Sequence, residues 1–120
     1  MANKLVWVDI PTVNLDRAMR FYSAVLGGQV EKQEYPGMVI ATLPGKEGES
    51  SGCLYVSETV KPSADGPLVY LNVHGRLDEA LEAVGPSGGQ VLEPKVSIAP
   101  FGFRGVILDT EGNRIALHSM

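Results

Sequence analysis

The sequence predicts an α+β fold in which one domain, residues 1–120, contains two tandem βαβββ modules. The first observation is an internal repeat: LDRA at residues 15–18 is matched by LDEA at 77–80, and GGQV occurs at both 27–30 and 88–91. The second observation is that each copy has a strand pattern before it, a helical stripe within it and turn residues after it. The shared order of elements indicates that the chain folds as two similar units.

The first module covers about residues 1–57. Residues 4–11 alternate around Val6, Val8 and Ile10. Such alternation predicts a strand with one apolar face, and we expect these three side chains to pack under the helices.

A helix is predicted directly after this strand. Asn14 can cap it, because its side chain can accept a hydrogen bond from a free amide of the first turn. Apolar residues then recur at helical spacing until Gly27 and Gly28, which end the helix. Three further strands are predicted over residues 29–35, 38–43 and 51–56, separated by turn and loop residues.

A linker rich in Pro, Ser and charge, about residues 58–67, leads to the second module, about residues 68–120. The second module repeats the order of the first. Its elements are predicted as a strand over 68–74, a helix over 77–84, and strands over 90–98, 101–109 and 114–119.

Composition narrows the classes of function. A formal net charge of -4 gives no basic face for nucleic acid, so no nucleic-acid partner is expected. No apolar run approaches the roughly 20 residues that cross a bilayer, and no membrane partner is expected. Cys53 is the single cysteine, so the chain can form no internal disulfide. These features predict a cytoplasmic protein.

Two motifs carry a resemblance to a known family: residues 14–18 (NLDRA) with Phe21-Tyr22, and residues 109–115 (DTEGNRI). With the two modules around them, they resemble the vicinal oxygen chelate superfamily of glyoxalase I, bleomycin-resistance proteins and extradiol dioxygenases. The resemblance implies a cupped, eight-stranded mixed sheet with helices on its convex face, a homodimer and, in the enzymes, a divalent metal in the cup. It does not fix the reaction, because this fold carries several chemistries.

The positions that hold the metal in the family's enzymes carry unsuitable residues here. Aligned on the first motif, the first-strand position falls on Trp7, whose indole has no free lone pair. The fifth-strand position falls on Leu68 or Val69, and the last-strand carboxylate position falls on Ala116. Only Cys53 is a conceivable donor on the strand over 51–56. No metal cofactor is therefore expected.

Strand alternation predicts which side chains line the cup instead. They combine two aromatic walls with a few polar groups, which suits a small hydrophobic or aromatic ligand. The predicted ligand-binding residues are Trp7, Asp9, Leu68, Tyr70, Asn72, Ala116 and His118.

Several of these residues can be interpreted in two ways. Trp7 either walls the cup or fills it. His118 is a candidate general base if it pairs with Asp9, with Tyr70 as a further catalytic candidate, but a lone histidine at a strand end is more often structural. The polar side chains could equally serve structural hydrogen bonds.

Two residues outside this list can also be interpreted in two ways. Arg104 points either inward, to bind an anion, or outward as a solvated charge, and the sequence favours outward. Cys53 is expected to be a core residue rather than a nucleophile.

The sequence favours a small-molecule-binding member of the superfamily, one that sequesters or senses a metabolite or drug without a metal. The alternative is an enzyme, either a glyoxalase-like lyase or isomerase or a metal-independent one using Asp9, Tyr70 and His118. A third possibility is a subunit whose cup is filled by its own side chains and which acts through protein partners.

Overall fold

A computed structural model describes residues 4–46, 49 and 51–120 and confirms the two βαβββ modules. The first module is β1 (Trp7–Thr12), α1 (Leu15–Leu26), β2 (Glu31–Tyr35), β3 (Met38–Thr42) and β4 (Ser51–Val56). The second is β5 (Val69–Asn72), α2 (Leu77–Val84), β6 (Gln90–Ser97), β7 (Phe103–Leu108) and β8 (Arg114–Ser119).

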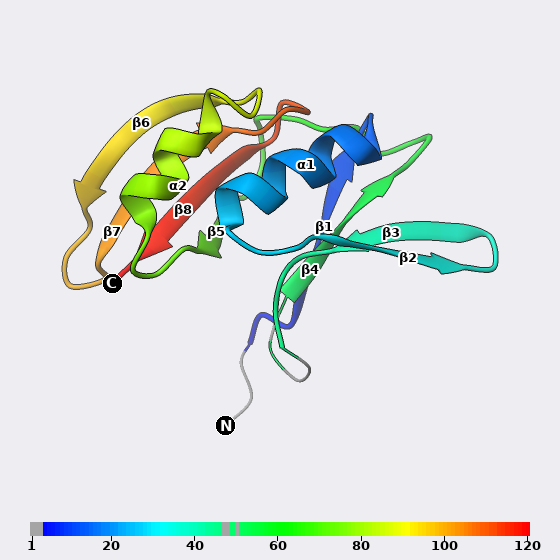
Figure 1. Cartoon of the computed structure of the whole chain (residues 1–120), viewed down its shortest axis with the longest axis horizontal. Coiled ribbons are helices and arrows are strands. Elements are labelled where there is room, and N and C mark those ends of the chain that lie inside the picture. The colour runs from blue at the N-terminus through cyan, green and yellow to red at the C-terminus, as the bar shows by residue number, and fades with distance from the viewer. Residues whose placement is uncertain (1–3, 47–48, 50) are drawn as a thin grey trace.

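The eight strands form two mixed four-stranded sheets, with the orders β1-β4-β3-β2 and β5-β8-β7-β6 (Figure 1). In each sheet the first and last strands of the module pair in parallel, and the other pairs are antiparallel. The structure therefore refines the predicted eight-stranded sheet: β1 and β5 are edge strands of separate sheets in the described part of the chain.

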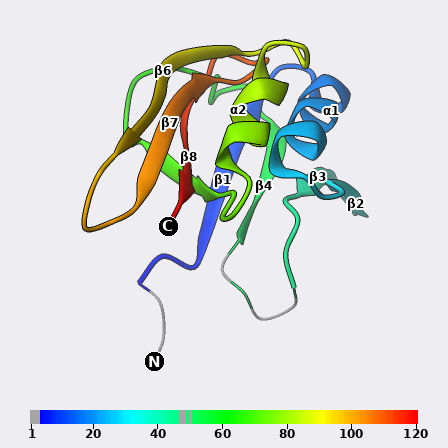
Figure 2. The same ribbon diagram turned by 60° about the vertical axis from the view of Figure 1, so that its left-hand side comes forward.

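The two helices lie side by side against the sheets (Figure 2). The Asn14 side chain caps α1 by accepting from the Arg17 amide at 3.0 Å, and Gly27 ends the helix in the left-handed region with a φ of 74°. Ala18 and Ala80, which match in the repeat, are both fully buried. α1 and α2 are the helices of the described residues, and neither is long and apolar enough to cross a membrane.

The core lies between the helices and the sheets. Ile10 of β1 and Ile115 and Leu117 of β8 are buried in it, as the alternation predicts, and Val8 packs against it. Val6 does not follow the prediction: it is 68% exposed. The reason is that β1 begins only at Trp7, so Val6 precedes the part of the chain that the helices cover.

The turn of the DTEGN motif joins the second module to the first. The buried Asp109 carboxylate accepts a hydrogen bond from the Tyr22 hydroxyl of α1 at 2.5 Å. It also accepts from the amides of Glu111 and Asn113 within its own turn. The Asn113 side chain donates to the Pro11 carbonyl of β1 at 2.8 Å. Burial and the Asp109 charge raise the pKa of Tyr22 well above its usual value, so its hydroxyl remains a donor.

Glu111 of the same turn binds the start of α1. Its carboxylate accepts from the amides of Val13 and Asn14, each at 2.8 Å, and from the Arg17 guanidinium at 2.8 and 3.0 Å. The Thr110 hydroxyl donates to it as well. Burial opposes the charged form, but these donors outweigh it and lower the pKa of Glu111 to about 2.

We predict that Glu111→Gln lowers the free energy of unfolding at pH 7 by about 2 kcal/mol, because hydrogen bonds to a charged group are lost. The folded pKa of about 2 lies below the usual 4.5, so the contribution is present above pH 4.5 and is lost as the pH falls toward 2. Urea unfolding at pH 7, 4 and 3 measures this, and the gap between variant and wild type should narrow with falling pH. Glu82→Gln, on the exposed face of α2, is the matched control. An equal difference in unfolding free energy between variant and wild type at all three pH values would contradict the role given to Glu111.

Candidate functional site

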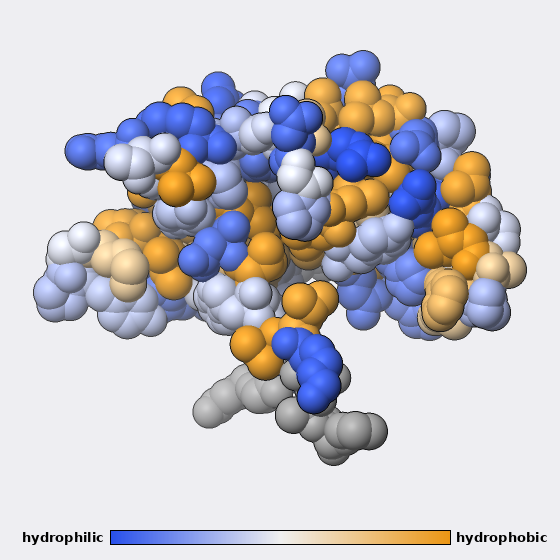
Figure 3. Space-filling view, turned by 180° about the vertical axis from the view of Figure 1, so that it is seen from behind, coloured by the Kyte–Doolittle hydropathy of each residue, from blue (hydrophilic) through white to orange (hydrophobic). Residues whose placement is uncertain are grey.

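Each sheet has one face against the helices and one open face. On the first sheet, Ile10 and Leu54 are buried in the core, so the alternating residues Trp7, Asp9 and Cys53 lie on the open face. Seen from behind, the surface carries apolar residues in separate patches among polar ones (Figure 3). The open face of the second sheet carries Tyr70, Asn72, Arg104, Val106, Ala116 and His118, as strand register and parity place them.

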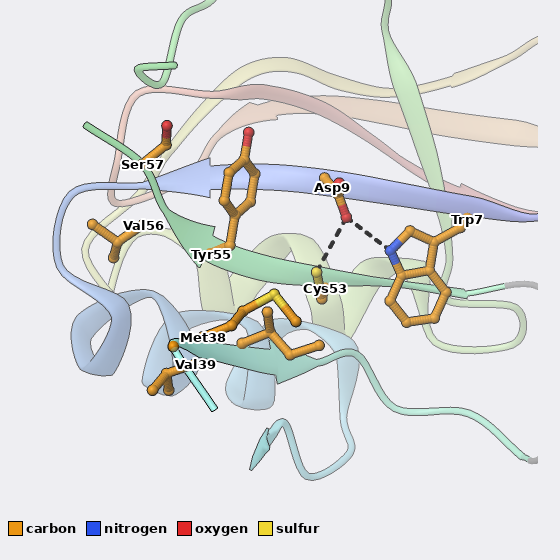
Figure 4. Close-up of a pocket in the computed structure, with 10 residues that line it drawn as sticks. Trp7, Asp9, Met38, Val39, Cys53, Tyr55, Val56 and Ser57 are labelled. Atoms are coloured by element: carbon orange, nitrogen blue, oxygen red, sulfur yellow. Dashed lines mark hydrogen bonds between the residues drawn. The ribbon is translucent and has the colours of Figure 1, made fainter. Parts of the chain in front are cut away.

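A pocket of about 530 Å³ lies on the open face of the first sheet (Figure 4). Trp7 and Asp9 of β1, Met38 of β3, and Cys53 and Tyr55 of β4 line it, with five further residues. The Asp9 carboxylate lies between two donors: the Trp7 indole N–H at 2.8 Å and the Cys53 thiol at 3.3 Å. This lining is largely apolar and aromatic around a single carboxylate.

Cys53 is buried beside this carboxylate. Burial first, and then the hydrogen bond to Asp9 and its negative charge, raise the pKa of the Cys53 thiol to about 11. The thiol is therefore protonated at neutral pH, which does not suit a nucleophile. Cys53 is buried, but it lies on the open face beside the pocket and not in the core cluster between the helices and the sheets.

A second pocket, of about 590 Å³, lies between β1 and β5. Trp7 and Leu68, Tyr70 and Asn72 are among its lining residues. Trp7 thus lines both pockets, and it is 48% exposed. The Trp7 side chain therefore forms a wall of the cup and does not fill it. Ala116 and His118 line neither of these two pockets.

Arg104 lies on the open face of the second sheet, and the outward orientation favoured by the sequence is wrong. A Cβ at Gly105 would lie 2.6 Å from a methyl carbon of Leu81 in α2, so position 105 faces the helices and Arg104 faces away from them. The Arg104 guanidinium donates to the Tyr70 hydroxyl at 2.5 Å and lies over its ring, 5.8 Å from the centroid. The sequence could not show this, because the glycines of FGFRG hide the alternation of β7.

No contact among the described residues brings His118 and Asp9 together. His118 lies in the second sheet, where its Nε2 is 2.5 Å from the Phe101 carbonyl and its ring meets the Tyr70 ring edge-on at 6.2 Å. Asp9 lies in the first sheet with Trp7 and Cys53 as partners. Asn72 accepts from the His74 amide, a structural bond. A base assembled from Asp9 and His118 has no support in this geometry.

The residues at the expected metal positions do not fit a metal. The Trp7 indole donates to Asp9, Ala116 has no donor atom, and Val69 packs against the core. Register places Tyr70 beside Ala116, and the Tyr70 hydroxyl already accepts from a cation. Across the described ranges, no three His, Cys, Asp or Glu side chains are grouped so as to hold a metal ion.

The sequence missed Met38 and Tyr55 as lining residues of the first pocket. Tyr55 could have been found, because it is two residues after Cys53 on the same strand and so shares its face. Met38 could not, because it depends on the pairing of β3 with β4.

Comparison with known proteins places the chain among related sequences and folds. Residues 4–117 match a family profile described as "Glyoxalase/Bleomycin resistance protein/Dioxygenase superfamily". A Mycobacterium bovis protein named "Putative glyoxylase CFP32" is 28% identical over 117 residues, which are 92% of this chain and 43% of that protein. A Mycobacterium tuberculosis protein of the same name matches equally. The chain therefore spans less than half the length of the curated relatives it matches.

Solved structures share the fold. A glyoxalase/bleomycin resistance protein from Albidiferax ferrireducens superposes with a TM-score of 0.77 at 15% identity, covering 98% of this chain and 99% of that one. A glyoxalase I mutant from Zea mays gives a TM-score of 0.73 at 19% identity, over 96% of this chain and 45% of that one. At these identities the likeness shows the fold alone.

We predict that Cys53 reacts slowly with iodoacetamide in the folded protein. A pKa of about 11 leaves little thiolate at pH 8, so alkylation should be at least about tenfold slower than in urea, where the thiol has its ordinary pKa. Asp9→Asn removes a charge that raises this pKa and should speed the reaction in the folded state. Asp65→Asn, in the exposed linker, is the control. Equal rates in wild type and Asp9→Asn would show that Asp9 does not govern the thiol.

Proposed function

This chain belongs to the Glyoxalase/Bleomycin resistance protein/Dioxygenase superfamily, and on the basis of its site we propose that it binds a small hydrophobic or aromatic molecule without a metal ion. The observation that carries the proposal is Trp7: a half-exposed indole that lines two adjoining pockets and is held by its hydrogen bond to Asp9. An aromatic wall fixed in this way offers a flat apolar surface at little cost in side-chain freedom.

The rest of the lining supports the same class of ligand. Met38 and Tyr55 add apolar surface on one side of Trp7, and Leu68 and Tyr70 add it on the other. Pockets of about 530 and 590 Å³ are within the range that holds small organic molecules. The few polar groups can orient a ligand without supplying a nucleophile.

The alternative is a glyoxalase-like lyase or isomerase, which the name of the mycobacterial relatives suggests. Two observations favour binding over this chemistry. Trp7 and Ala116 supply no metal donors where the family's enzymes hold their metal, and Asp9 and His118 belong to different sheets. A metal-independent enzyme would have to use a catalytic group other than this pair.

We predict that small aromatic probes such as 2-naphthamide change the fluorescence of Trp7, the single tryptophan, in a saturable way. Trp7→Ala should weaken their binding by about tenfold, because a stacking surface is lost. Isothermal titration calorimetry measures both proteins on one scale. Phe103→Ala is the matched control, because it removes an exposed aromatic ring that Lys95 covers on the opposite side of the second sheet.

Two results would count against this proposal. The first is unaltered probe binding in Trp7→Ala, which would place the ligand elsewhere. The second is a stoichiometric metal in elemental analysis together with thermal stabilisation by Ni²⁺, Zn²⁺ or Mn²⁺, which would contradict metal-free binding and favour the enzyme.

We also propose that the protein is a homodimer, with β1 at the contact. β1 is an edge strand, and Val6 directly before it exposes an apolar side chain. An edge with exposed apolar residues favours pairing with a second chain. Burial of the Val6 side chain would also remove apolar surface from water.

We predict that Val6→Lys raises the dimer dissociation constant by at least about tenfold, because association would desolvate the added charge. Sedimentation equilibrium measures the constant. Val60→Lys, in the linker, is the control, since Val60 is an apolar residue that is 50% exposed. A wild-type monomer at millimolar concentration, or a dimer indifferent to Val6→Lys, would reject this contact.

A further inference from the structure

We propose that the open face of the second sheet is a carboxylate-binding site, in which the Arg104 guanidinium and the Tyr70 hydroxyl hold the anionic group of the ligand. The ligand class is then a small aromatic or apolar carboxylate. The inference rests on the proposed binding function and adds the charge that the ligand carries.

The first step is the position of Arg104 and Tyr70 on the sheet. Tyr70 lies opposite Ala116 on β8, and Arg104 lies opposite His118, also on β8. β8 runs between β5 and β7, so the hydrogen bond from Arg104 to Tyr70 passes over β8. The short Ala116 side chain, which is fully buried, leaves the room for this crossing.

The second step is the charge. The nearest acidic partner of Arg104 is Glu93 on β6, but the Nη2–Oε1 distance is 3.5 Å, longer than a good hydrogen bond. The Glu93 side chain is also 45% exposed, so water screens its charge. The Arg104 side chain itself is only 24% exposed. The guanidinium is thus largely withdrawn from water beside a weakly held counter-charge.

The third step is the unmet hydrogen-bonding capacity. The Nε–H of Arg104 is buried and has no acceptor among the described residues. A guanidinium has five N–H donors, and the recorded hydrogen bond to Tyr70 uses one of them. A group that lacks acceptors and is partly desolvated gains most from an anion that offers two oxygens in one plane, as a carboxylate does.

The fourth step is the apolar part of the ligand. Tyr70 faces two ways: its hydroxyl meets Arg104, and its side chain lines the pocket between β1 and β5 with Trp7 and Leu68. Arg104 does not line this pocket itself, so in the proposed complex the ring occupies the pocket and the carboxylate reaches past Tyr70 to the guanidinium. This geometry selects an arene carboxylate over a neutral or cationic arene.

The test compares two probes of the same shape, 2-naphthoate and 2-naphthamide, by calorimetry on the full chain. We expect 2-naphthoate to bind at least about tenfold more tightly, because a charge-assisted pair replaces a neutral hydrogen bond. Arg104→Gln should abolish the difference between the two probes, because the cation that pairs with the carboxylate is lost. Arg20→Gln removes the same charge from the exposed side of α1 and should keep the preference.

Arg104→Lys keeps the charge and loses the planar fork, so it should retain part of the preference even if Arg104→Gln folds poorly by circular dichroism. Equal affinity of the wild type for both probes would overturn the inference, as would a carboxylate preference that survives in Arg104→Gln. In either case, binding of 2-naphthamide at Trp7 would leave the proposed function standing. Failure of both probes to bind counts against the proposed function, and failure of 2-naphthoate to bind more tightly than 2-naphthamide counts against the carboxylate site.

Discussion

The structure depends on the turn over residues 109–113, where polar groups of the second module bind the first. A buried carboxylate is costly unless donors compensate it, and Asp109 finds them in its own turn and in Tyr22 of α1. Glu111 at the same time satisfies two free amides at the start of α1. The turn and the helix end therefore complete each other's hydrogen bonding, which ties the C-terminal hairpin to the first helix.

This connection determines where a ligand can bind. It holds both helices on one side, so the apolar faces of both sheets pack against helices and the opposite faces stay open. Residues on the open faces lie outside the core cluster between the helices and the sheets, and polar groups such as Asp9 and Arg104 are tolerated there. Trp7 lies where the two open faces approach each other, which is why it lines both pockets. The candidate site follows from the way the modules are joined.

Features set by local sequence could be predicted, and those set by distant pairing could not. The Asn14 cap and the Gly27 end of α1 involve neighbouring residues, and the repeat carries the order of elements. The division into two sheets depends on whether β1 and β5 share hydrogen bonds, which neither strand encodes alone. The separation of Asp9 from His118 follows from that division. The resemblance supplied the cup, but the partners within it came only from the structure.

Ala116 shows how one small residue can set the chemistry of a sheet face. Neighbouring side chains on a face share space and charge, so a change at one position alters what its neighbours can do. A carboxylate at 116 would stand beside Tyr70, on the face over which Arg104 reaches the Tyr70 hydroxyl, and would offer the guanidinium a counter-charge. With alanine there, the metal donor is missing and a protein cation stands close by without a full counter-charge. On our proposal, the residue that removes metal chemistry from this cup also creates its affinity for a carboxylate.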